Sequence, residues 1–218
     1  MTQNEIQSCI LGNRGTLRIG LTLSYPDLYV ENLWEDFSSL YPHINYEIYE
    51  DSSDKLLNLL KDNIIEIALI RTPTHINPIF KSYNAVEETL MAVFHKDNPW
   101  LSSNLDTINI NLLRNVPLSV SRGFKQKVLD VFDDAGINPI LLNVCSSRPT
   151  TIMWVRLKKA VGLVTTTSYK ILETDILRCR PLTGGDMSAK RSFTTLKNHN
   201  LSSVAKSFLN FATDEANF

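Results

Sequence analysis

The first third of the chain alternates between strand-like and helix-like patterns, and this order limits the possible folds. Apolar residues at every second position predict strands at Leu17–Leu21 and Ile44–Ile48. Apolar stripes at helical spacing predict a helix over Leu28–Tyr41 and a shorter one over Leu56–Leu60. The apolar run Ile64–Ile70 predicts a strand that is covered on both faces. Strands separated by helices favour parallel pairing with right-handed crossovers, so we predict an α/β fold.

The middle of the chain repeats this order, which predicts a second α/β unit. Strands are expected at Pro117–Ser121, Pro139–Cys145 and Val161–Thr165, with a helix over Phe124–Ala135 after the first of them. A second helix is expected after Ser146-Ser147, and a third is expected to begin within the hydroxyl-rich segment 165–168.

Polar side chains gather where the predicted strands end, which is where ligands bind in open α/β sheets. After the first strand, Thr22 and Ser24 precede a helix N-terminus, whose free N–H groups and positive dipole end attract anions. Arg71 ends the third strand and is either a surface charge or a clamp for a carboxylate. Each hydroxyl could also simply cap its helix. The same pattern recurs later in the chain, at Ser121-Arg122-Gly123, at Ser146-Ser147 and at Thr165-Thr166.

The overall composition is that of a globular protein with no bulk attraction to nucleic acid. The 22 Lys+Arg and 23 Asp+Glu residues give a net charge of −1. The paired cations Lys158-Lys159 and Lys190-Arg191 are interpreted as solvated surface. No apolar run reaches the length of a membrane span, and the N-terminus lacks the features of a signal peptide, so we predict a cytoplasmic protein with no membrane partner.

The cysteines, histidines and motifs predict neither a metal site nor an enzyme. Three cysteines without a Cys-x-x-Cys pair argue against a disulfide framework or structural zinc, although a Cys145–Cys179 redox switch is conceivable. The four histidines show no ligand spacing, and we predict no metal and no cofactor. Neither Ser121 nor Cys145 has an identifiable base that would make it a nucleophile, and no catalytic motif is present.

Six segments, taken in order, resemble the effector-binding domain of LysR-type transcriptional regulators. The likeness runs from Gly15 to about Ala212. The matching segments are GTLRIG at 15–20, LYPHI at 40–44, LLNLLKDNIIEIALIRTP at 56–73, EETLMAVFHKDNPW at 87–100, NLLRNVPLSV at 111–120 and VGLV at 161–164.

This resemblance implies two Rossmann-like subdomains of the periplasmic-binding-protein type, joined by two crossover strands with an effector cleft between them. Subdomain I would comprise residues 15–90 and 183–218, and subdomain II would comprise 91–182. The crossover strands would lie near Leu90–Phe94 and Leu177–Leu182. Residues 1–14 would be a linker-helix stub or a tail.

The resemblance also implies that the chain senses a small effector, often an organic acid or an amino-acid derivative. Arg71, Arg122 and Arg148 favour a carboxylate or another anion. By resemblance the first subdomain would contribute Thr22 and Ser24. The second would contribute Ser121, Arg122, Gly123, Phe124, Ser146, Ser147, Thr165 and Thr166.

The same family implies a homodimer, with a tetramer as a further option in the full-length protein. In the dimer the helix Leu28–Tyr41 would lie against the helix Phe124–Ala135 of a second copy. Both helices could instead be ordinary amphipathic core helices. DNA would be bound only through an N-terminal winged helix-turn-helix that this chain lacks, either because the domain is excised or because the protein is a truncated relative. The alternative function is a solute-binding protein of the same fold.

A departure from the family concerns the turn before the strand at 161–164. Ala160 stands where the family commonly has glycine, which changes how closely the backbone can approach a ligand.

Overall fold

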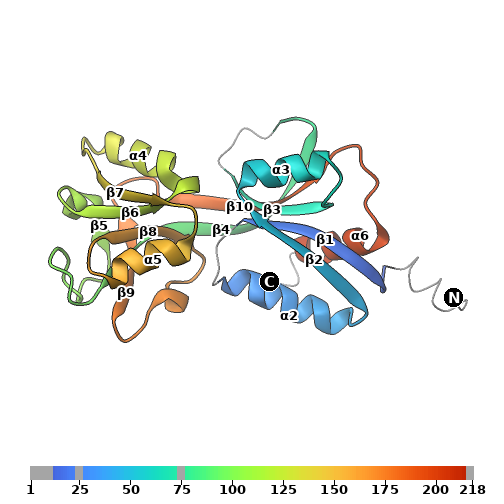
Figure 1. Ribbon diagram of the computed structural model, residues 1–218, viewed down its shortest axis with the longest axis horizontal. Helices are drawn as coiled ribbons and strands as arrows, with labels where there is room; N and C mark the ends of the chain where they lie inside the picture. The colour runs from blue at the N-terminus through green and yellow to red at the C-terminus, as the bar shows by residue number, and fades with distance from the viewer. Residues whose placement is uncertain (1–11, 23–26, 73–76, 215–218) are drawn as a thin grey trace, which may run out of the picture. The chain divides into compact units, whose positions relative to one another are not determined.

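The chain folds into two compact α/β units, as the sequence predicts (Figure 1). The structure is a computed structural model that describes residues 12–22, 27–72 and 77–214. One unit contains the N-terminal part of the chain, up to Val86, together with the C-terminal segment that begins at Lys190. The other unit extends from Glu87 to Ala189.

A parallel sheet forms the centre of the first unit. Strand β1 (Gly15–Thr22) lies between β2 (Ile44–Asp51) and β3 (Ile67–Thr72) and runs parallel to both. Three helices cover the sheet: α2 and α6 lie on one face, and α3 lies on the other (Figure 1). They are α2 (Leu28–Leu40), α3 (Ser53–Lys61) and α6 (Ser203–Thr213).

The two faces of this sheet are packed differently. Phe208 of α6 lies at the centre of an aromatic cluster, with its ring centroid 5.0 Å from that of Phe37 and 5.8 Å from that of Phe193. On the other face, α3 lies close to β1 at Gly20, where an added Cβ would be 2.7 Å from the side chains of both Leu56 and Ile65. A side chain at this position would therefore displace the terminal methyl groups of Leu56 and Ile65.

The second unit has a mixed sheet with the order β4-β8-β6-β7. Strand β6 is parallel to β7 and β8, whereas β4 is antiparallel to β8 and, on its other side, to β9. The strands are β4 (Phe80–His95), β5 (Ile108–Asn109), β6 (Pro117–Ser121), β7 (Ile140–Cys145), β8 (Val161–Thr166) and β9 (Leu177–Thr183). The helices are α4 (Lys125–Asp134), α5 (Arg148–Arg156) and the 3-10 turns η1 (Ile110–Leu113), η2 (Arg122–Phe124) and η3 (Tyr169–Leu172).

Helices α4 and α5 lie on opposite faces of this sheet (Figure 1). On the α4 face, Val128 and Phe132 are fully buried in the larger core. On the α5 face, a Cβ added at Gly162 of β8 would lie 2.9 Å from Val155 and 3.0 Å from Thr151. Gly162 therefore allows α5 to lie directly against the central strand.

The strands that connect the two units are β4 and β10 (Ser188–Leu196). This corrects the prediction that Leu177–Leu182 forms the second crossover, because those residues form β9, which belongs entirely to the second unit. The two segments have similar apolar alternation and are separated by a Gly-Gly turn, so their pattern did not identify which one returns to the first unit.

Two further details differ from the sequence-based expectations. Between β8 and β9, a segment that the structure describes throughout, the chain forms only the single turn η3 instead of the expected α-helix. Strand β3 begins at Ile67 rather than Ile64, because Asn63 has a φ of 55° and the Ile64 N–H bonds back to the Leu59 carbonyl.

A buried carboxylate holds the start of α6, and its removal should destabilise the first unit. Glu66 is 5% exposed and accepts hydrogen bonds from the Ser202 N–H (2.7 Å) and hydroxyl (3.1 Å). We expect Glu66→Ala to lower the free energy of unfolding by about 1.5–3 kcal/mol in urea denaturation, because a charged hydrogen-bond acceptor is lost. The matched control Glu47→Ala, at an exposed position of β2, should change the free energy of unfolding by less than about 0.5 kcal/mol. Equal losses in both variants would contradict this role for Glu66.

Candidate functional site

The second unit brings the predicted strand-end residues of β6, β7 and β8 to one edge of its sheet. Ser121 is the register partner of Cys145 at the ends of β6 and β7. Strand β8 is parallel to β6 on its other side and ends with Thr165 and Thr166. Because the three strands are mutually parallel, their carboxyl ends share an edge, and the turns that follow them lie next to one another.

The turn after β6 exposes a cation before α4 begins. Arg122 and Gly123 are exposed in η2, whereas the ring of Phe124 is buried in the core beneath α4. Phe124 therefore anchors the turn and does not present its ring to solvent. Ser121 occupies the N-cap position, but its side chain makes no capping hydrogen bond.

The turn after β7 has two exposed or half-exposed hydroxyls and a buried guanidinium. Ser147 is the N-cap of α5 and makes no side-chain capping bond; its Oγ lies 3.1 Å from Thr150 Oγ1. Ser146 is exposed. Arg148, which follows, is only 5% exposed, and its Nη2 donates a hydrogen bond to the Thr165 carbonyl. Arg148 thus ties the first turn of α5 to the end of β8.

The two threonines that end β8 differ in their surroundings. Thr166 forms a local turn, with its Oγ1 accepting from the Ser168 N–H (3.1 Å) and donating to the Ser168 carbonyl (2.9 Å). Thr165 is 2% exposed, and within the described parts of the chain its Oγ1 has no hydrogen-bond partner. A buried hydroxyl without a partner is costly, so it is satisfied when water or a ligand supplies an acceptor or donor.

The strand ends of the first unit bring Thr22 and Arg71 together. Arg71 Nη1 lies 3.4 Å from Thr22 Oγ1, and both side chains are partly exposed. Ser24, the other predicted contact of this unit, lies outside the described residues.

The antiparallel pairing of β10 with β3 places Arg191 directly opposite Arg71. Arg191 is 2% exposed and lies over the Tyr29 ring at 5.3 Å, so the interpretation of Lys190-Arg191 as a solvated pair is wrong for Arg191. This buried cation could not be predicted from the sequence, because one arginine in a polar strand carries no signal for burial. Two arginines on neighbouring strands thus lie at the same register position of the first unit.

The structure rules out the Cys145–Cys179 redox pair. Cys145 is on β7 and Cys179 is on β9, and the intervening strands β6, β8 and β4 separate them by about 19 Å at the usual strand spacing. A disulfide needs a Cα separation of about 4.4–6.8 Å. Cys145 instead donates to Asn143 Oδ1, which also accepts a hydrogen bond of 2.6 Å from Ser119.

No group of three or more metal-ligating side chains is found among the described residues. In the same part of the chain, no helix is long and apolar enough to cross a membrane.

Comparison with known proteins gives one family and a well-populated fold. The profile of the family described as the LysR substrate binding domain matches residues 11–217. An uncharacterised HTH-type transcriptional regulator of Bacillus subtilis (strain 168), YwbI, is 32% identical over 82 residues, which is 38% of this chain and 27% of the relative. The chain therefore aligns with only part of that relative's length.

Two solved structures share the fold at low sequence identity. The effector-binding domain of QuiR in complex with shikimate has a TM-score of 0.80 and 15% identity, covering 92% of this chain and 96% of that one. Full-length CbnR in complex with its target DNA has a TM-score of 0.79 and 18% identity, covering 96% of this chain and 71% of that one.

The thiol of Cys179 should be unreactive in the native state. Burial, reinforced by the Glu173 carboxylate, raises the pKa of this thiol to about 12. Because only the thiolate reacts, a Cys9→Ser/Cys145→Ser variant should react with Ellman's reagent at pH 8 about a thousandfold more slowly when native than in guanidinium chloride. Equal rates in the two states would show that the thiol is ionised and accessible.

Proposed function

Because the chain belongs to the LysR substrate-binding domain family, we propose that it senses a small anionic effector and thereby controls transcription by a longer protein. The proposal that the effector is an anion rests on the arginines at the strand ends. Arg122 is exposed beside the hydroxyl of Ser121, and Arg71 lies beside Thr22 and opposite Arg191. Hydroxyls and guanidinium groups together are the donors that hold a carboxylate.

We propose effector contacts separately for the strand-end residues of each unit. In the second unit the contacts are the hydroxyls and the turn backbone around Arg122, and the proposed set is Ser121, Arg122, Gly123, Ser146, Ser147, Thr165 and Thr166. In the first unit they are Thr22, Ser24 and Arg71. Shikimate, the molecule held by the related QuiR domain, is a carboxylic acid, which supports the proposed ligand class.

The proposed output is a change in how the longer protein binds DNA. The related CbnR binds its target DNA as a full-length protein. With a net charge of −1, the present chain has no excess of cations to hold a phosphate backbone, so we assign DNA contact to a segment outside it. An effector alters that contact only if it binds one conformation of the regulator more tightly than another. This role requires no catalysis, and it places the protein in the cytoplasm with its DNA.

We further propose that the chain forms a homodimer, with α2 of one copy against α4 of the second. Leu28 (41% exposed) and Leu40 (64% exposed), at the two ends of α2, supply apolar surface for this contact.

Replacing Arg122 tests the anion site. We expect carboxylates from a panel that includes shikimate to raise the thermal midpoint of the chain, because a ligand that binds the folded state stabilises it. For the carboxylate that does so, Arg122→Ala should weaken binding about 10- to 150-fold in calorimetry, the loss of about 1.5–3 kcal/mol expected for a charged hydrogen bond.

The matched control is Arg114→Ala, which removes an exposed arginine elsewhere in the same unit and should leave affinity unchanged. Equal affinity in Arg122→Ala and the wild type would remove Arg122 from the site. A preference for uncharged members of the panel would contradict the proposed ligand class.

A further inference from the structure

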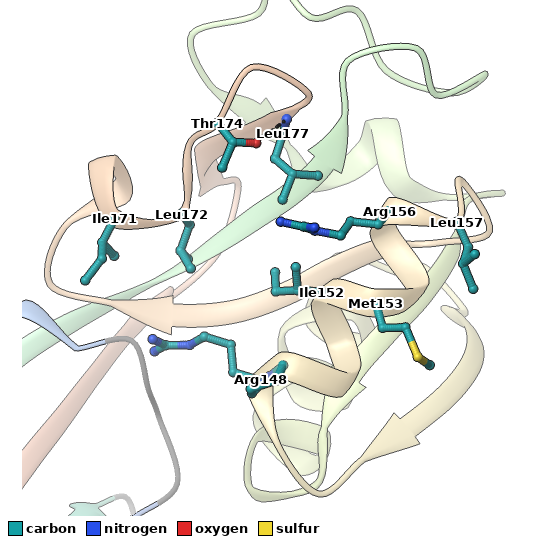
Figure 2. A pocket seen from close by; sticks show the side chains of 10 residues that line it. Arg148, Ile152, Met153, Arg156, Leu157, Ile171, Leu172, Thr174 and Leu177 are labelled. Carbon is teal, nitrogen blue, oxygen red and sulfur yellow. Dashed lines mark hydrogen bonds between the residues drawn. The ribbon is translucent and has the colours of Figure 1, made fainter.

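The second unit contains a groove that shares no residue with the strand-end set proposed above, although Arg148, which lines the groove, donates to the carbonyl of Thr165 in that set. It has a volume of about 550 Å³, within the range of small-molecule sites. One wall is helix α5, and the other is η3 with the segment that leads into β9 (Figure 2). All its lining residues belong to this one unit: Arg148, Pro149, Ile152, Met153, Arg156, Leu157, Ile171, Leu172, Thr174 and Leu177.

The groove is apolar along its length and cationic on the α5 side. Arg148, Ile152 and Arg156 follow one another at four-residue spacing, which places them on the same face of α5. Ile152 faces Leu172 across the groove, and Leu177 closes it beyond the guanidinium of Arg156 (Figure 2). A bound molecule would thus meet hydrocarbon in the middle and the exposed guanidinium of Arg156 on the α5 side.

The lining contains two guanidinium groups and no carboxylate. Arg148 is held by its bond to the Thr165 carbonyl. Arg156 extends across the groove, and no hydrogen bond or ion pair is found for it in the described parts of the chain (Figure 2). The nearest acid in the sequence of the opposite wall, Glu173, is paired with Arg180. The positive charge of the groove is therefore not neutralised by a side chain that lines it.

From this arrangement we infer a second ligand site, which takes an amphipathic monocarboxylate. Its hydrocarbon part lies between Ile152, Leu172 and Leu177, and its carboxylate pairs with the guanidinium of Arg156. The pairing of one cation with an apolar channel selects this class: a sugar would leave the apolar walls unmatched, and a neutral hydrocarbon would leave Arg156 without an anion. A planar guanidinium suits a carboxylate because two N–H groups can donate in parallel.

Octanoate is a suitable probe, and octanamide, an uncharged analogue with the same hydrocarbon chain, is its control. With the methyl groups of Ile, Leu and Val labelled for NMR, octanoate should cause saturable shifts at Ile152, Leu172 and Leu177 of the full 218-residue chain. Arg156→Gln should weaken this binding at least about tenfold, whereas Arg114→Gln, with the same loss of charge elsewhere, should not. Arg156 is exposed, so the variant is expected to fold, and its unshifted methyl spectrum reports whether it does.

The outcomes separate this site from the strand-end site. Octanoate binding that persists in Arg122→Ala and weakens at least about tenfold in Arg156→Gln supports the groove. Equal binding of octanoate and octanamide would overturn the ion pair. Shifts confined to other methyl groups, or no saturable shift in the groove, would overturn the site itself while leaving the anion site at Arg122 to its own test.

Discussion

Both units depend on a helix lying directly against a central strand, which a glycine permits in each. In the first unit Gly20 of β1 leaves room for Leu56 of α3, and in the second Gly162 of β8 leaves room for Val155 of α5. A Cβ at either position would come within 3.0 Å of methyl groups of these side chains, which would have to move to accommodate it. The strand ends that follow, Thr22 and Thr165, therefore have their positions fixed by packing a few residues earlier.

The second constraint is the placement of buried cations beside those strand ends. Arg148 and Arg191 are almost inaccessible, and burying a guanidinium is unfavourable unless it is paired and hydrogen-bonded. Arg148 bonds to the Thr165 carbonyl, and Arg191 lies over the Tyr29 ring. Such groups hold the surrounding backbone in one arrangement.

Repeated local patterns made much of this architecture predictable from the sequence. The apolar stripe of α2 and the alternation along β1 each record which face is buried, so the α/β class follows from their order. The strand-end hydroxyls were identifiable for the same reason. The pairing of the strands could not be predicted, because β9 and β10 have similar apolar patterns. Their pairing depends on contacts with β4 and β3, which are distant in sequence.

The burial of single charged residues could also not be predicted from the sequence. Arg191 is adjacent to Lys190 in the chain, yet Lys190 is exposed and Arg191 is not, because successive residues of a strand point to opposite faces. The helix expected after β8 does not form, for a related reason. Hydroxyls favour a helix start but do not supply the apolar stripe that keeps a helix packed, and Thr166 uses its hydroxyl in a local turn.

Arg148 connects the two proposed sites of the second unit, since it lines the groove and its guanidinium holds the end of β8. A molecule in the groove would lie against this side chain, and any movement of its guanidinium would change the bond to the Thr165 carbonyl. Conversely, a ligand that fixes Thr165 would fix Arg148. Coupling between two sites is reciprocal in free energy, so each ligand must change the affinity for the other by the same factor. A single buried side chain would then be enough to make the two sites interdependent.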